Sequence, residues 1–120
     1  MMKQSILSGI LLLTALVVLA ACGRQGKKEY SERVITVTIE PQRYFTEAIA
    51  GNRFTVVSMV PQGSSPETYD PTPKQLVSLA ESEAYFRIGH IGFELTWMER
   101  LMKNAPHTQV FDLSRGIELI

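Results

Sequence analysis

The sequence is poor in cysteine and has no excess of charge of either sign. Its single cysteine, Cys22, cannot form an internal disulfide or a zinc site built from several cysteines. Lys and Arg together number 12 and Asp and Glu together number 12, so there is no basic excess of the kind that nucleic-acid binding requires. With 45% hydrophobic and 20% charged residues in 120 positions, the composition is that of one globular domain. Nucleic acid is therefore not expected as a partner.

Familiar catalytic motifs are also missing. The sequence contains no HExxH, GxxxxGK[ST], GxSxG or GxGxxG pattern. Nothing places a serine on a strand-to-helix elbow, where a nucleophile would be expected. The chain is therefore not expected to be an enzyme, and no catalytic cofactor is predicted.

One apolar run, residues 6–21, stands near the amino terminus. Lys3 is the only charged residue before Arg24, and the run is shorter than the roughly 20 residues that a membrane-spanning helix needs. A basic start, an apolar middle and small residues at the end are typical of a secretory signal, predicted here over residues 1–21. The alternative is an uncleaved membrane anchor in which the cysteine is incidental.

The end of this run, Leu19-Ala20-Ala21-Cys22, resembles the lipobox of bacterial lipoproteins. The resemblance implies cleavage before Cys22 and acylation of its thiol, which makes membrane lipid a partner. We therefore expect an exported protein, anchored by lipid to a bacterial membrane on its periplasmic or cell-surface side. The polar residues 22–33 are predicted to be a flexible tether, and residues 34–120 the folded part.

Strand-like and helix-like segments alternate along residues 34–120. Strands are predicted at 34–39, 54–60, 84–88 and 110–113, and helices at 42–50, 73–80 and 93–102. The first helix is indicated by apolar residues at helical spacing, Tyr44, Phe45, Ala48 and Ile49, and the second by Thr72 as N-cap before Pro73. The order βαβαβαβ predicts an α/β fold, a parallel sheet with helices on its faces. Ligands of such sheets bind at the carboxyl ends of the strands.

The loop at residues 61–73 follows the second predicted strand and is rich in proline. Prolines restrict the shapes that a loop can adopt and lower the entropy lost when it is ordered. The loop also brings Glu67, Tyr69 and Asp70 to the predicted ligand edge. A loop shaped in advance that holds a carboxylate suits a metal site.

Two motifs together make a family resemblance specific. They are Pro61-x-Gly63-x-Ser65-Pro66-x-Thr68-Tyr69-x-Pro71-Thr72-Pro73 and Gly89-x-Ile91-Gly92-Phe93-Glu94-x-x-Trp97-x-x-x-Leu101. The pair, with the flanking segments 37–60 and 111–117, resembles the solute-binding lipoproteins of bacterial zinc and manganese ABC transporters. The resemblance extends over about the whole of the chain after Cys22. It implies capture of a divalent metal ion, zinc or else manganese, as a transported ligand and its delivery to an ABC import permease.

The family carries a metal-ligating histidine between the positions of Pro66 and Thr68, where this sequence has Glu67. A carboxylate can bind zinc and also suits manganese, so Glu67 is the first candidate ligand. The other interpretation is a solvated loop carboxylate. Family members have two lobes joined by a long helix, with the metal between them. The chain is therefore expected to be the amino-terminal lobe only, incomplete, and to bind zinc weakly or not at all by itself.

The remaining candidates have mainly structural interpretations. His90 stands at a strand end and could reach a metal, although the resemblance does not make its position a ligand and a local hydrogen bond is the alternative. Pro66, Tyr69, Asp70 and Pro71 are predicted to shape the loop and the cleft, with Tyr69 packed beneath the loop and Asp70 in a turn. Glu94 is predicted to be structural, favoured by the helix dipole and by capping. Trp97 is predicted to form a core stripe with Phe93 and Leu101.

Other functions stay open on the sequence. The chain could be a single-lobe surface lipoprotein that acts as an interaction or adhesion module, or a truncated fragment without function. A metallohydrolase half-domain would require a catalytic base and further ligands that we do not find.

Overall fold

The computed structural model describes residues 2–9 and 32–120 of the chain. Residues 2–9 are helical. The rest of the predicted signal peptide, Cys22 and most of the predicted tether lie outside the described residues. Within the described ranges no helix has both the length and the apolar character that crossing a membrane requires.

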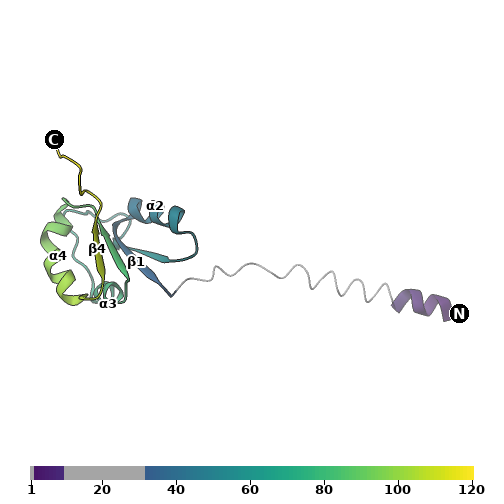
Figure 1. Cartoon of the computed structure of the whole chain (residues 1–120). Helices are drawn as coiled ribbons and strands as arrows, with labels where there is room; N and C mark the ends of the chain where they lie inside the picture. Colours follow the sequence, from purple (N-terminus) through teal and green to yellow (C-terminus); the bar gives the residue numbers. More distant parts are fainter. Residues whose placement is uncertain (1, 10–31) are drawn as a thin grey trace.

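The folded part is an α/β unit built on one parallel sheet (Figure 1). The elements in chain order are β1 (Val34–Ile39), α2 (Glu40–Ala50), β2 (Thr55–Val60), α3 (Pro73–Ala80), β3 (Ala84–Arg87), α4 (Gly92–Asn104) and β4 (Gln109–Asp112). The four strands lie in the order β2-β1-β3-β4, and every neighbouring pair is parallel. The predicted βαβαβαβ order and parallel sheet are confirmed.

The strand order places the helices on two faces of the sheet. The chain moves from β1 to β2 in one direction and from β2 through β3 to β4 in the other. Because crossovers between parallel strands are right-handed, this reversal puts α2 on one face and α3 and α4 on the other. All three helix-to-strand turns lie at the amino edge of the sheet, so the strand-to-helix loops gather at its carboxyl edge.

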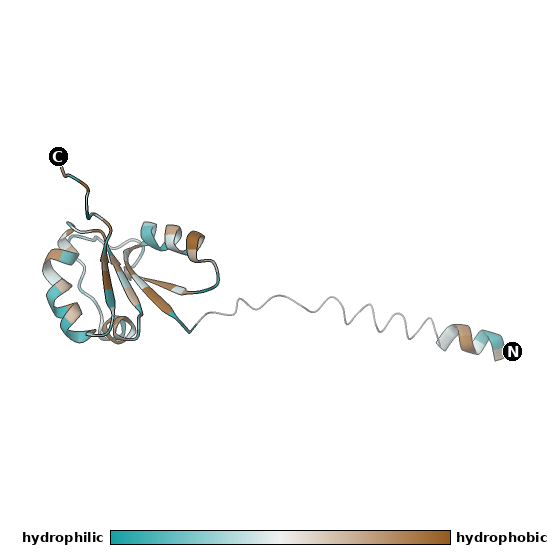
Figure 2. Ribbon diagram, viewed as in Figure 1, coloured by the Kyte–Doolittle hydropathy of each residue, from teal (hydrophilic) through white to brown (hydrophobic). Residues whose placement is uncertain are grey.

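The main core lies between the sheet and the pair α3 and α4. Its buried members are Met59, Val60, Leu79, Tyr85, Phe93, Leu101 and Ala105. A smaller cluster, Ile35, Val37 and Val56, lies on the face that carries α2. The strands form the hydrophobic centre of the domain, while much of the outer face of α4 is hydrophilic (Figure 2).

Helix α2 differs from its sequence-based prediction in where it begins and in which face it buries. It begins at Glu40, and Pro41 lies in its first turn, where a missing N–H costs little. The Gln42 side chain closes this end by accepting hydrogen bonds from the amides of Thr38 and Ile39, at 3.0 and 3.1 Å.

The apolar side chains that predicted α2 do not pack on the sheet. Tyr44, Phe45 and Ile49 are 70, 64 and 84% exposed. Gln42 faces the sheet instead and donates a hydrogen bond to the carbonyl oxygen of Phe86 at 3.2 Å. Beside α2 the sheet face stays open, with a groove of about 700 Å³ lined mainly by apolar side chains that include Ile35, Phe86 and Phe111.

Candidate metal site

The proline-rich loop at 61–72 lies against the start of α4 at the carboxyl edge of the sheet. Three hydrogen bonds fasten it there. The carbonyl oxygen of Pro66 accepts from the amide of Phe93 at 2.8 Å, and Oε2 of Glu67 accepts from the amide of Gly92 at 3.0 Å. Further along, Oδ1 of Asp70 accepts from Nε1 of Trp97 at 3.2 Å. The loop and the first turns of α4 therefore form one unit.

The far end of the loop is fixed by the predicted capping box of α3. Thr72 Oγ1 accepts from the Gln75 amide at 3.3 Å, and Gln75 Oε1 accepts from the Thr72 amide at 2.9 Å. The same Oε1 accepts from the hydroxyl of Tyr69 at 2.9 Å, and the Tyr69 ring lies 6.2 Å from that of Phe93. Half-buried Pro66 and Pro71 flank Tyr69 in the chain. The Tyr69 ring therefore contacts the core while its hydroxyl bonds locally.

Gly92 is required by the closeness of the loop. A Cβ atom at this position would overlap Oε2 of Glu67 and would lie 2.8 Å from the carbonyl oxygen of Glu67. Backbone atoms cannot yield as the end of a long side chain can, so glycine is what lets the loop approach α4.

Glu67 is exposed, and its carboxylate sits at the amino end of α4. The partial positive charge of a helix amino terminus favours a carboxylate there. Oε2 accepts a hydrogen bond from the Gly92 amide, whereas Oε1 receives no hydrogen bond from the part of the chain that the structure describes. The side chain is thus oriented, and one of its oxygens is available to an external cation.

His90 lies in the turn between β3 and α4, two positions before Gly92, and is exposed. Glu67 and His90 are therefore on elements that meet at one edge of the sheet. In residues 2–9 and 32–120, however, no group of three or more His, Cys, Asp or Glu side chains could together hold a metal ion. Zinc sites normally have three or four protein ligands, so these two residues do not make a complete site.

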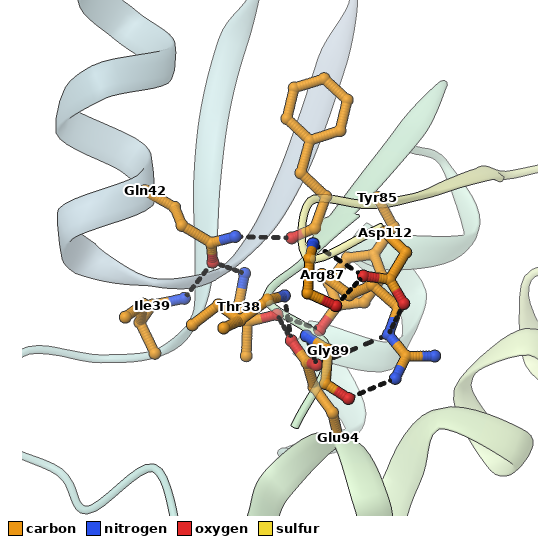
Figure 3. A network of polar contacts seen from close by, with 11 residues as sticks. Thr38, Ile39, Gln42, Tyr85, Arg87, Gly89, Glu94 and Asp112 are labelled. Carbon is orange, nitrogen blue, oxygen red and sulfur yellow. Dashed lines mark hydrogen bonds and ion pairs between the residues drawn. The ribbon is translucent and has the colours of Figure 1, made fainter. Parts of the chain in front are cut away.

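Glu94 is almost wholly buried, at 1% exposure, and lies in a polar network that the sequence did not predict (Figure 3). Its Oε1 accepts from the hydroxyl of Thr38 at 2.5 Å and from the amide of Ile88 at 2.7 Å, and its Oε2 accepts from the amide of Gly89 at 2.6 Å. The expectation that Glu94 caps its own helix is corrected. The turn after β3 brings the Ile88 and Gly89 amides to the carboxylate, which caps the strand end instead.

Arg87 supplies the positive charge beside Glu94. Its Nε lies 3.5 Å from Oε2 of Glu94 and 3.6 Å from Oδ2 of Asp112, and its Nη2 donates to the carbonyl oxygen of Gly89 at 2.7 Å. Asp112 Oδ1 in turn accepts from the hydroxyl and amide of Ser114, at 2.6 and 2.9 Å, and these bonds lower the pKa of Asp112 below its ordinary value. The network thus joins the carboxyl ends of three strands.

Sequence reasoning missed Thr38, Arg87 and Asp112. The available signal was their position, because each lies at or beside the carboxyl end of a different predicted strand, and such ends meet at one edge of the sheet. Thr38 also bonds the hydroxyl of Tyr85 at 2.7 Å, and burial raises the pKa of Tyr85.

Trp97 is half-buried between Phe93 and Leu101, which are fully buried.

Most of this chain matches a family of known proteins. Residues 35–120 match the family described as "ZnuA: Zinc-uptake complex component A periplasmic". The chain belongs to this zinc-uptake family. Its parallel α/β sheet is correspondingly like that of a crystal structure of ZnuA, with a TM-score of 0.68 and 42% identity over 73% of this chain.

The proteins that this chain is similar to are named for several metals. The "Manganese-binding lipoprotein MntA" of Halalkalibacterium halodurans is 29% identical over 99% of this chain and 40% of its own length. The "Iron ABC transporter substrate-binding lipoprotein MtsA" of Streptococcus pyogenes serotype M6 is 30% identical over 98% of this chain and 40% of its own length. A zinc-bound ZnuA deletion mutant is 43% identical, with a TM-score of 0.67, over 72% of this chain and 33% of that one.

The manganese-bound periplasmic metal binding protein of Candidatus Liberibacter asiaticus, at 20% identity and a TM-score of 0.66, shares the fold. It matches 73% of this chain and 33% of its own. The chain thus spans about 40% of the length of the curated relatives it matches and a third of the solved structures.

Proposed function

We propose that the chain is the amino-terminal lobe of a lipid-anchored substrate-binding protein that captures a divalent metal ion and delivers it to an ABC import permease. The observation that carries the proposal is Glu67. Its carboxylate is held at the carboxyl edge of the sheet by the Gly92 amide, at 3.0 Å, and keeps Oε1 available. That edge is where parallel α/β sheets bind their ligands.

The proposal divides the chain as its sequence suggests. Residues 1–21 are the signal peptide, 22–33 the tether that carries acylated Cys22, and 34–120 the lobe, with further ligands supplied by another part of a longer polypeptide. The relatives named as lipoproteins and as ABC transporter substrate-binding proteins support an extracytoplasmic, membrane-anchored location. They do not favour an adhesion module or an enzyme.

Zinc is the proposed ion, with manganese second. The family description and the zinc-bound relative at 43% identity support zinc. The relatives named for manganese, and the hard oxygen ligand that Glu67 provides, support manganese. In either case one oxygen of Glu67 would bind the ion. Two lobes would close around the ion, and the permease would recognise this closed form.

The proposal is tested by locating a bound ion on the lobe. Mn²⁺ broadens the NMR signals of nearby backbone amides even when it binds weakly, so it is titrated into residues 23–120. We expect broadening centred on residues 65–68 and 90–92, and its loss in Glu67→Gln, which keeps an oxygen for Gly92 but removes the charge.

Glu118→Gln is the matched control, since Glu118 is an exposed carboxylate in the carboxyl-terminal segment. It should leave the broadening as it is in the unchanged chain. Broadening centred elsewhere, or equal in the unchanged chain and in Glu67→Gln, would refute the role of Glu67.

A further inference from the structure

Two carboxylates hold the same turn from opposite sides. The turn runs from Ile88 to Ile91, between β3 and α4, carries His90 and leads into Gly92, the first residue of α4. From inside the protein, Glu94 accepts from the amides of Ile88 and Gly89, at 2.7 and 2.6 Å. From outside, Glu67 accepts from the amide of Gly92 at 3.0 Å. The first carboxylate is buried and the second is exposed.

The inner carboxylate is held from several directions. Besides the two amides, Glu94 accepts from the hydroxyl of Thr38 on β1 and faces Arg87 Nε at 3.5 Å. A buried charge is tolerated only where partners replace its lost hydration, and here three donors and a guanidinium do so. Glu94 therefore ties the turn to β1 through Thr38 and to β3 through Arg87 (Figure 3).

Neighbouring residues pack closely against the turn at both of its ends. Gly89 has φ +124°, a conformation open to glycine, and a Cβ there would lie 2.9 Å from Cβ of Ser114. At the other end, Gly92 has no room for a Cβ against the backbone of Glu67. Only His90 and Ile91 separate Gly89 from Gly92, whose amide orients Glu67.

We propose that Glu94 is a positioning residue for the candidate metal site at the carboxyl edge of the sheet. By fixing the Ile88 and Gly89 amides, Glu94 places the Gly92 amide. That amide holds Oε2 of Glu67 and so presents Oε1 to the cation. This inference rests on the proposed function for the identity of the ligand. The link from Glu94 to Gly92 is a property of the metal-free chain and can be measured separately.

The experiment uses Glu94→Gln, which keeps the size of the side chain but removes its charge and one acceptor. Glu99→Gln is the control on the same helix, because Glu99 is exposed and, among residues 2–9 and 32–120, its one ion pair is with Lys103 at 2.7 Å. Amide hydrogen exchange is recorded without metal, and Mn²⁺ affinity is taken from amide broadening around Glu67. Urea unfolding shows whether each variant folds.

In Glu94→Gln we expect the amide hydrogens of Gly92, Ile88 and Gly89 to exchange at least about tenfold faster, while that of Val37 in the centre of β1 is unchanged. We expect Mn²⁺ affinity to fall about tenfold, as it does when outer-shell partners of metal ligands are lost. Glu99→Gln should match the unchanged chain in amide exchange, in Mn²⁺ affinity and in urea unfolding. A merely structural role would lower unfolding stability without this selective pattern.

Wild-type exchange at Gly92, or wild-type affinity, in folded Glu94→Gln would overturn the inference. If Glu94→Gln does not fold, Thr38→Val, which removes one donor to Glu94 at nearly constant volume, is interpreted by the same criteria. If the unchanged chain shows no broadening near Glu67, the proposed function fails, and exchange at Gly92 alone then upholds or overturns the positioning role of Glu94.

Discussion

Glu67 and Gly92 are 25 positions apart in the sequence, and the carboxylate of the first accepts the amide hydrogen of the second at 3.0 Å. The hydrogen bond joins the loop after β2 to the first residue of α4. It gives Glu67 a structural role that does not exclude a metal ligand role, because each carboxylate oxygen can act separately. The loop is therefore part of the folded framework and carries its candidate ligand in a defined place.

Replacing Gly92 with alanine should destabilise the domain. The added Cβ would lie 2.8 Å from the carbonyl oxygen of Glu67, so the loop or the helix must move. We expect a loss of about 1–3 kcal/mol in the free energy of unfolding, the usual range for overpacking, measured by urea denaturation. Thr96→Ala, at an exposed position of the same helix, should change it by less than about 0.5 kcal/mol. Equal effects of the two substitutions would contradict the close contact.

The chain by itself should bind zinc more weakly than micromolar. The described residues contain no cluster of three ligands, and Glu67 with His90 supplies at most two. Calorimetry on residues 23–120 measures this, and Glu67→His should strengthen binding because imidazole is a better zinc ligand than a single carboxylate oxygen. A micromolar or tighter affinity that Glu67→Ala abolishes would show that the lobe holds a complete site.

Thr72→Ala should remove the N-cap of α3. The Thr72 hydroxyl accepts from the Gln75 amide at 3.3 Å, and Gln75 in turn bonds the Met59 carbonyl at 2.7 Å. We expect a loss of about 1 kcal/mol in unfolding free energy, seen as a lower urea midpoint at unchanged slope. Thr68→Ala, an exposed threonine in the preceding loop, serves as the control and should leave the midpoint unchanged. An equal shift in both would show that the hydroxyl of Thr72 is not the cause.

Acid should weaken the domain partly through Asp112. The hydrogen bonds from Ser114 hold its pKa below the ordinary value of 3.8. The ionised form is therefore favoured by folding, so its contribution is complete above pH 3.8 and is lost as the pH falls from there through the lower pKa of the folded chain.

Urea unfolding at about pH 5 and about pH 3 tests this. Asp112→Asn should lose less stability between the two conditions than the unchanged chain, whereas Glu118→Gln should behave as the unchanged chain does. Identical losses in Asp112→Asn and the unchanged chain would rule out the contribution of Asp112.

The sequence alone determined the order of the elements, because that order depends on local properties. The alternation of β-branched runs with helical spacing predicted the parallel sheet, and Thr72 with Pro73 predicted the start of α3, since caps act within a few residues. The proline-rich loop after β2 was likewise recognisable as a segment at the carboxyl edge of the sheet.

The tertiary structure decided which side chains each element buries and which residues meet. Phe45 and Ile49 of α2 are exposed because Gln42, bonded to the end of β1, turns another face of the helix to the sheet. Glu94 became a buried strand cap because the ends of β1 and β3 both come to it. Such contacts depend on positions distant in the chain, and no local pattern contains the distances between them.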